Sequence, residues 1–133
     1  MIKVVASIVG GLITWIIVAT IGNLLFRVAW PGYAEAEIAT MFTLAMMVAR
    51  LLLGALSSLC AGFTGAWITK GNGTATKILG IVVTAMFVPV HYLLWDKFPI
   101  WYHAIFLASL FPLTLLGAKL LRRRNGTMQT LRD

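Results

Sequence analysis

The sequence has very little charge and a single cysteine. Of its 133 residues, 11% are charged and 60% are hydrophobic. Soluble domains carry about 25% charged residues, so this composition excludes an ordinary soluble domain. Cys60 has no second cysteine to pair with, which excludes an internal disulfide. It lies within an apolar stretch, where a lone cysteine usually acts as a small hydrophobic side chain.

Acidic residues are the scarcest charged type. The chain has 4 Asp and Glu against 11 Lys and Arg, which gives a formal net charge of +7. A basic balance of this size can indicate nucleic-acid binding. Here, however, the cations stand at the ends of apolar segments, where Lys and Arg set the orientation of membrane helices. We therefore expect a membrane protein that does not bind nucleic acid.

Motifs of several small membrane-protein families are also missing. The first apolar segment has no glutamate, on which the small multidrug exporters depend, and the chain lacks the Phe-x-Thr-Phe-Ser type of motif found in fluoride channels. One cysteine cannot supply the Cys-x-x-Cys pair of the quinone-linked disulfide-forming proteins or a Cys-x-x-Cys-His haem attachment motif. The residues therefore indicate no family.

Four long apolar segments dominate what is present. Each is long enough, at about 20 helical residues, to cross a bilayer core of about 30 Å. The sequence predicts an all-α integral membrane protein with one domain over residues 1–133, a four-helix bundle with short loops. The predicted spans are residues 4–26, 38–69, 78–95 and 102–121, followed by a basic tail at 122–133.

The second segment is too long for one straight span. At about 1.5 Å per residue, a helix over residues 38–69 would measure about 48 Å. Trp67 and Lys70 mark one membrane boundary, so Arg50 falls near the other and residues 38–49 form an apolar extension of a long second helix. That extension either covers its own bundle or binds a partner. Glycines within the segment, Gly54 among them, are the expected bend points.

Small residues recur every fourth position along this segment, which places them on one helix face. Small side chains let helix backbones approach closely in lipid. The predicted packing face, within the bundle or within an oligomer, consists of Gly54, Ser58, Gly62 and Ala66.

The charges predict that both termini are cytoplasmic. With four spans, the inner side would hold Lys3, Lys70, Lys77, Lys119, Arg122, Arg123, Arg124 and Arg132, and the outer side would hold Arg27 and Lys97. This asymmetry follows the positive-inside rule and is typical of a bacterial inner-membrane protein. The outer boundary would also carry an aromatic belt of Trp30, Tyr33, Trp95, Trp101 and Tyr102.

Polar residues unusual for a membrane span gather at the predicted outer face. The cluster comprises Asn23, Arg27, Arg50, His91, Asp96 and His103, with Glu35 and Glu37 nearby. Four hypotheses follow from it: a metal site, a haem held between His91 and His103, an acid–base pair of histidine and Asp96, or a transport pathway. The histidine spacing matches no metal-ligand pattern, and no serine or cysteine stands beside a plausible base.

The cluster therefore favours binding over catalysis. We expect a non-catalytic subunit, assembly factor or homo-oligomer that binds lipid or protein at its outer face, with no catalytic residue, metal or cofactor. Its partners would be the bilayer and either further copies of itself or another membrane protein. In this hypothesis Arg50 pairs with Asp96 or with a lipid phosphate. An oligomeric transporter or channel is the alternative, and a metal- or haem-binding enzyme ranks below it.

Overall fold

The structure, a computed structural model, describes residues 1–132. All regular secondary structure in these residues is α-helical. Four of its five helices are long and apolar enough to cross a membrane, so the chain is an integral membrane protein. The helices are α1 (Ile2–Ala29), α2 (Tyr33–Ala39), α3 (Leu44–Ile68), α4 (Gly73–Leu93) and α5 (Ile100–Thr130).

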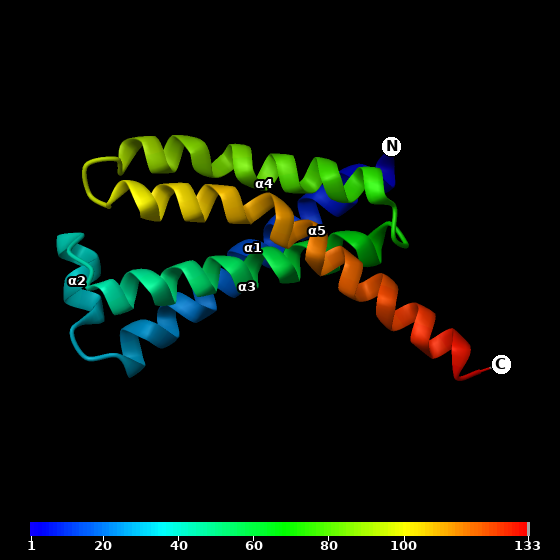
Figure 1. Ribbon diagram of the computed structural model, residues 1–133, viewed down its shortest axis with the longest axis horizontal. Coiled ribbons are helices and arrows are strands. Elements are labelled where there is room, and N and C mark those ends of the chain that lie inside the picture. The colour runs from blue at the N-terminus through cyan, green and yellow to red at the C-terminus, as the bar shows by residue number, and fades with distance from the viewer. Residues whose placement is uncertain (133) are drawn as a thin grey trace.

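The four long helices run alternately up and down, so the two termini lie at the same end of the bundle (Figure 1). Helix α3 is central: it packs along both α1 and α5, while α4 packs mainly on α5. The short helix α2 lies at the opposite end from the termini. We call that end the α2 end, and the end with the termini the basic end.

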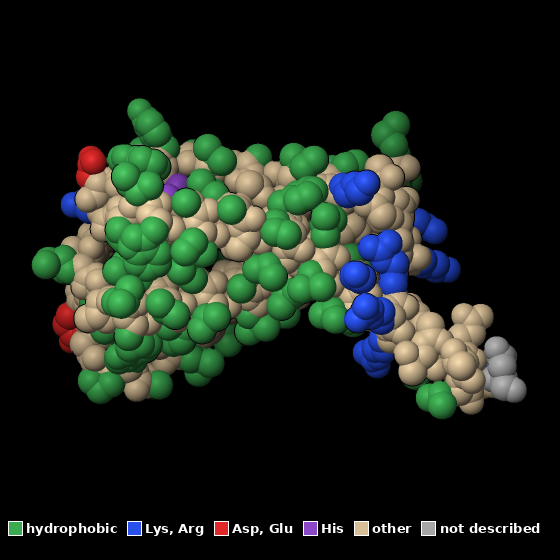
Figure 2. Space-filling model, viewed as in Figure 1, with side chains coloured by type: hydrophobic (Ala, Val, Ile, Leu, Met, Phe, Trp, Pro, Cys, Tyr) green, Lys and Arg blue, Asp and Glu red, His purple; other side chains and the backbone are tan. Residues whose placement is uncertain are grey.

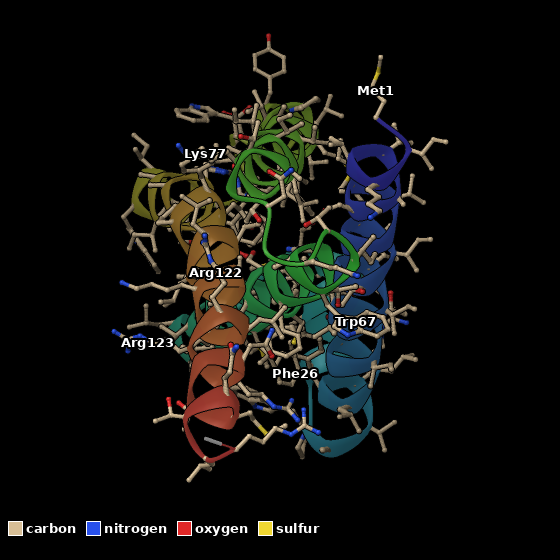
Figure 3. All side chains as sticks on the ribbon, turned by 90° about the vertical axis from the view of Figure 1, so that its right-hand side faces the viewer. Met1, Phe26, Trp67, Lys77, Arg122 and Arg123 are labelled. Carbon is tan, nitrogen blue, oxygen red and sulfur yellow. The ribbon has the colours of Figure 1, made fainter. Side chains whose placement is uncertain are left out.

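Charge divides between these two ends. Figure 2 shows Lys and Arg gathered where α5 leaves the bundle, with Asp and Glu at the α2 end. Figure 3 looks from the basic end and labels Lys77 on α4 with Arg122 and Arg123 on α5. The side of the bundle between the two ends is covered mostly by hydrophobic side chains in Figure 2, as a lipid-facing surface requires.

The prediction of one long second helix is wrong. The chain breaks between α2 and α3, because Thr40 adopts a left-handed conformation with φ 55° and ends α2. Thr43 then starts α3 by accepting a hydrogen bond from the Met46 backbone N–H at 3.3 Å. The break thus falls at threonines rather than at a glycine. It moves Leu44 into the first turn of the span and Arg50 into the second.

Residues 27–37 also differ from the expected loop. Helix α1 continues to Ala29, and α2 occupies most of the remainder. Gly32, at φ 81°, makes the turn before α2 in a conformation that favours glycine. Glu35 lies in the first turn of α2, where it complements the helix dipole, whereas Glu37 lies further along.

The other helices are longer than their predicted spans. Asn72 caps α4 by accepting from the backbone N–H groups of Thr74 and Ala75, so α4 begins before Ile78. Helix α5 continues through the basic residues 122–124 as far as Thr130. Its second half diverges from α4 in Figure 1, and Pro112 lies within this helix.

The small-residue face of α3 packs inside the monomer against α5. Gly54, Ser58, Gly62 and Ala66 are all buried. A Cβ atom on Gly62 would overlap the carbonyl oxygen of Thr114, so the two backbones touch at this crossing. Gly117 on α5 makes the reciprocal approach to the carbonyl of Leu59.

Candidate functional site

A cavity of about 410 Å³ lies at the α2 end of the bundle, between α1, α3, α4 and α5. One part of its lining is polar and includes Asn23, Arg27 and Arg50. Another part is apolar and aromatic, and includes Trp15, Phe87 and Phe106. The volume falls within the range of about 300–1,000 Å³ that is typical of small-molecule sites.

The cavity reaches the side of the bundle between α1 and α4. Leu24 on α1 and Val90 on α4 both line it, yet they are 49% and 42% exposed. Figures 1 and 3 agree that α1 and α4 diverge toward the α2 end. The flank at this opening is therefore apolar and exposed.

Arg50 is held by a hydrogen-bonded network above the cavity. Its Nη1 donates to the hydroxyl of Tyr33 at 2.8 Å and, more weakly, to Oδ1 of Asn23 at 3.4 Å. The Tyr33 hydroxyl in turn donates to Asn23 Oδ1 at 2.8 Å. The guanidinium also lies over the Phe42 ring, 4.7 Å from its centroid, in cation–π geometry.

The network ends at the carboxylate of Glu37. Asn23 Nδ2 donates to Glu37 Oε1 at 2.8 Å, and Arg27 Nε donates to Glu37 Oε2 at 2.6 Å. The hydrogen bond from Arg27 holds the pKa of Glu37 below its ordinary value, because it stabilises the ionised carboxylate.

The network carries unbalanced positive charge. It contains two guanidinium groups and one carboxylate, and the carboxylate is bonded to Arg27 rather than to Arg50. Among residues 1–132, Nε of Arg50 is sealed from solvent and has no hydrogen-bond partner. Arg50 is therefore positioned by neutral groups, and no ion pair of its guanidinium is found among residues 1–132.

His91 and His103 bond to each other directly. Their Nδ1 atoms are 2.7 Å apart, and Nε2 of His103 donates to the backbone carbonyl of Trp95 at 3.3 Å. The hypothesis of a haem between these histidines does not fit this geometry, since iron cannot stand between atoms that share a hydrogen bond. Within residues 1–132, no group of three or more His, Cys, Asp and Glu residues could hold a metal ion.

Asp96, one of the two partners predicted for Arg50, does not pair with it. Arg50 bonds to Tyr33 and Asn23, whereas Asp96 is exposed in the α4–α5 connection and forms no ion pair with any residue of the described range 1–132. The long separation in sequence left the partner of Arg50 open. Its Nη1 donates to a hydroxyl and to an amide oxygen in place of a carboxylate.

The cavity collects four of the six residues in the predicted polar cluster. Asn23, Arg27, Arg50 and His91 line it. His103 bonds to His91 but does not line the cavity, and Asp96 does not line it either. The sequence did not indicate the cavity role of Tyr102 and Phe98 or the bonding role of Tyr33: the two tyrosines were expected in an exposed belt, yet both are buried. No sequence signal identifies Tyr33, because it stands 17 residues from Arg50 along the chain.

Trp15 closes the cavity toward the middle of the bundle. Its indole N–H donates to the hydroxyl of Ser58 at 3.1 Å, and its ring lies 4.4 Å from that of Phe87, measured between centroids. The polar atom of a large buried side chain is thereby satisfied. The cavity thus runs from a cationic end to an aromatic end.

Comparisons of the chain with protein-family models, curated proteins and solved structures found no match.

Proposed function

We propose that this chain is a non-catalytic membrane protein that binds an anionic, lipid-like amphiphile in the cavity at its α2 end. The observation that carries the proposal is the lining of the cavity, which places Arg27 and Arg50 at one end and apolar and aromatic side chains at the other. An amphiphile has the same division between a polar head and an apolar chain.

Electrostatics favour an anionic head. With two guanidinium groups and one carboxylate, the polar end keeps a net positive charge when the network is intact. A phosphate or carboxylate near Arg50 would neutralise a charge that is otherwise costly at this depth. The opening flanked by Leu24 and Val90 supports entry from the bilayer, because an apolar chain could follow the head without crossing water.

The orientation we propose places the α2 end outside. The cations of the basic end, among them Lys77, Arg122 and Arg123, would then face the cytoplasm, and the cavity would open toward the outer leaflet of a bacterial inner membrane. A reporter that is active only in the cytoplasm should therefore be active when fused at either terminus. Activity restricted to a reporter inserted at Gly32 would reverse the orientation.

A transport function receives less support from the geometry. The cavity lining reaches Trp15, Phe87 and Phe106, and beyond it the backbones of α3 and α5 meet at Gly62 and Thr114. A pathway across the membrane would therefore have to form between chains in an oligomer. The cavity by itself is suited to binding from one side.

Lipid retention measured by native mass spectrometry tests the proposal. Protein in mild detergent is offered phosphatidylglycerol or phosphatidylcholine with the same acyl chains, which differ in head-group charge. We expect about ten-fold greater retention of phosphatidylglycerol, since a charge-assisted contact contributes about 1.5–3 kcal/mol.

Arg50→Gln should remove most of this preference, because glutamine can still bond to Tyr33 but carries no charge. Arg124→Gln is the matched control: it removes one positive charge near the C-terminal end of α5. Equal retention of the two lipids by the unmodified protein, or equal losses in the two variants, would show that the charge near the cavity does not select the ligand.

A further inference from the structure

The hydrogen-bond directions in the histidine pair determine what His91 offers to the cavity. A carbonyl oxygen only accepts, so Nε2 of His103 carries a hydrogen for its bond to Trp95. In the neutral ring, Nδ1 of His103 is then the acceptor. Nδ1 of His91 must be the donor across the 2.7 Å contact, which leaves Nε2 of His91 with a free lone pair.

Nε2 of His91 is not sealed within the protein. His91 lines the cavity, and no hydrogen-bond partner of its Nε2 is found among residues 1–132. Among residues 1–132, Nε of Arg50 is the only buried side-chain nitrogen or oxygen that is sealed from solvent and has no hydrogen-bond partner. Since Nε2 of His91 also has no partner, it cannot be sealed from solvent.

The acceptor and the cation are parts of one wall. A series of stacked rings leads from Arg50 to His91: Phe42 lies under Arg50, its centroid is 5.6 Å from that of Phe98, and Phe98 lies 4.6 Å from Tyr102. Tyr102 is 6.1 Å from His91 by ring centroids. Arg50 and His91 both line the cavity, so a head group bound there is offered a positive charge and a neutral hydrogen-bond acceptor.

We infer that the ligand's head group combines a singly charged phosphodiester with a hydroxyl, as a polyol phosphate does. The phosphate would lie toward Arg50, and the hydroxyl would donate to Nε2 of His91, which His103 holds in the accepting tautomer. The inference rests on the proposed function and narrows its ligand class. A site built to accept a hydrogen bond discriminates strongly against an analogue that lacks the donor.

Two lipids of equal charge test the inference. Phosphatidylglycerol and phosphatidylethanol with identical chains are both phosphodiester monoanions, but only the first has head-group hydroxyls. In competition, measured by native mass spectrometry in mild detergent, we expect the unmodified protein to retain phosphatidylglycerol about ten-fold over phosphatidylethanol. Glycerophosphoglycerol, which is the same head without chains, should not displace the bound lipid; displacement would assign the site to a soluble polyol phosphate.

The variant His91→Leu should lose the preference while it retains phosphatidylethanol as well as the unmodified protein does. Retention of phosphatidylethanol reports an intact cavity. The double variant His91→Leu/His103→Leu leaves no imidazole unpaired and should give the same result if the single variant is unstable. Tyr92→Leu is the control, because it removes an exposed polar side chain next to His91 on α4 that does not line the cavity, and it should keep the preference.

The outcomes separate this inference from the proposed function. If the unmodified protein retains the two anionic lipids equally, but each above phosphatidylcholine, the hydroxyl is not recognised and the proposed function stands. The inference is likewise overturned if His91→Leu keeps the preference. If neither anionic lipid is retained above phosphatidylcholine, the proposed function itself fails.

Discussion

The two halves of the bundle solve the problem of helix packing in opposite ways. Toward the basic end, small residues bring α3 and α5 together until backbone touches backbone, as at Gly62 and Thr114. Toward the α2 end, aromatic and polar side chains such as Phe106 and Arg50 hold the same helices further apart and leave a cavity. Close packing leaves no room for a ligand, so the cavity and the tight backbone contact lie in different halves.

The largest expected effect comes from breaking the close-packed half. Gly62→Ala places a methyl group on the carbonyl of Thr114, a backbone atom that cannot turn aside. We expect a loss of about 1–3 kcal/mol in the free energy of unfolding, measured by thermal unfolding in detergent. Gly126→Ala is the control, since a Cβ there meets nothing within 4 Å. An unchanged melting temperature for Gly62→Ala would mean that the crossing is looser than described.

The next effect should appear in the network at the α2 end. Tyr33→Phe removes the hydroxyl that accepts from Arg50 and donates to Asn23. Because Tyr33 is fully buried, the unpaired partners should cost about 1–3 kcal/mol locally. Hydrogen exchange should become faster in α2 while α5 is unaffected. Tyr92→Phe, at a residue that is 79% exposed, should change neither; faster exchange throughout the chain would contradict a local network.

A smaller effect is expected from the same change at Gly54, two turns before Gly62 on the small-residue face of α3. Gly54→Ala would place its methyl group 2.9 Å from Cε2 of Phe106, which is the end of a side chain that borders the cavity and can turn. We expect under about 1 kcal/mol of destabilisation by thermal unfolding, because the ring can move into free space. A loss as large as that of Gly62→Ala would show that the two halves are equally rigid.

The smallest effect should be the response of the α2 end to acid. The folded chain lowers the pKa of Glu37 from its ordinary 4.5, so its contribution to stability is complete above pH 4.5 and is lost as the pH falls through the lowered value. Hydrogen exchange in α2 should therefore become faster only in that acidic window. In Glu37→Gln, hydrogen exchange in α2 should already be faster at neutral pH and should not change further in the acidic window. A change between pH 6 and 8 would point to another group.

The spans and the division of charge could be predicted from the sequence because both depend on local composition. Any helix long and apolar enough to avoid water crosses a bilayer, wherever its neighbours stand, and cations at the ends of apolar segments are visible in the chain itself. The small-residue face of α3 was visible for the same reason: its four-residue spacing fixes one side of a helix. Which helix it meets was not specified.

Tertiary structure decided the break at Thr40–Thr43, the burial of Tyr33 and Tyr102, and the partners of Arg50. Each depends on contacts between residues far apart in the chain, and hydrophobicity along a membrane helix does not reveal which face turns inward, because lipid and protein interior are equally apolar. The pairing of His91 with His103 likewise required the relative rotation of α4 and α5. Composition determined that this chain lies in a membrane, and the packing of its helices determined where it has room for a ligand.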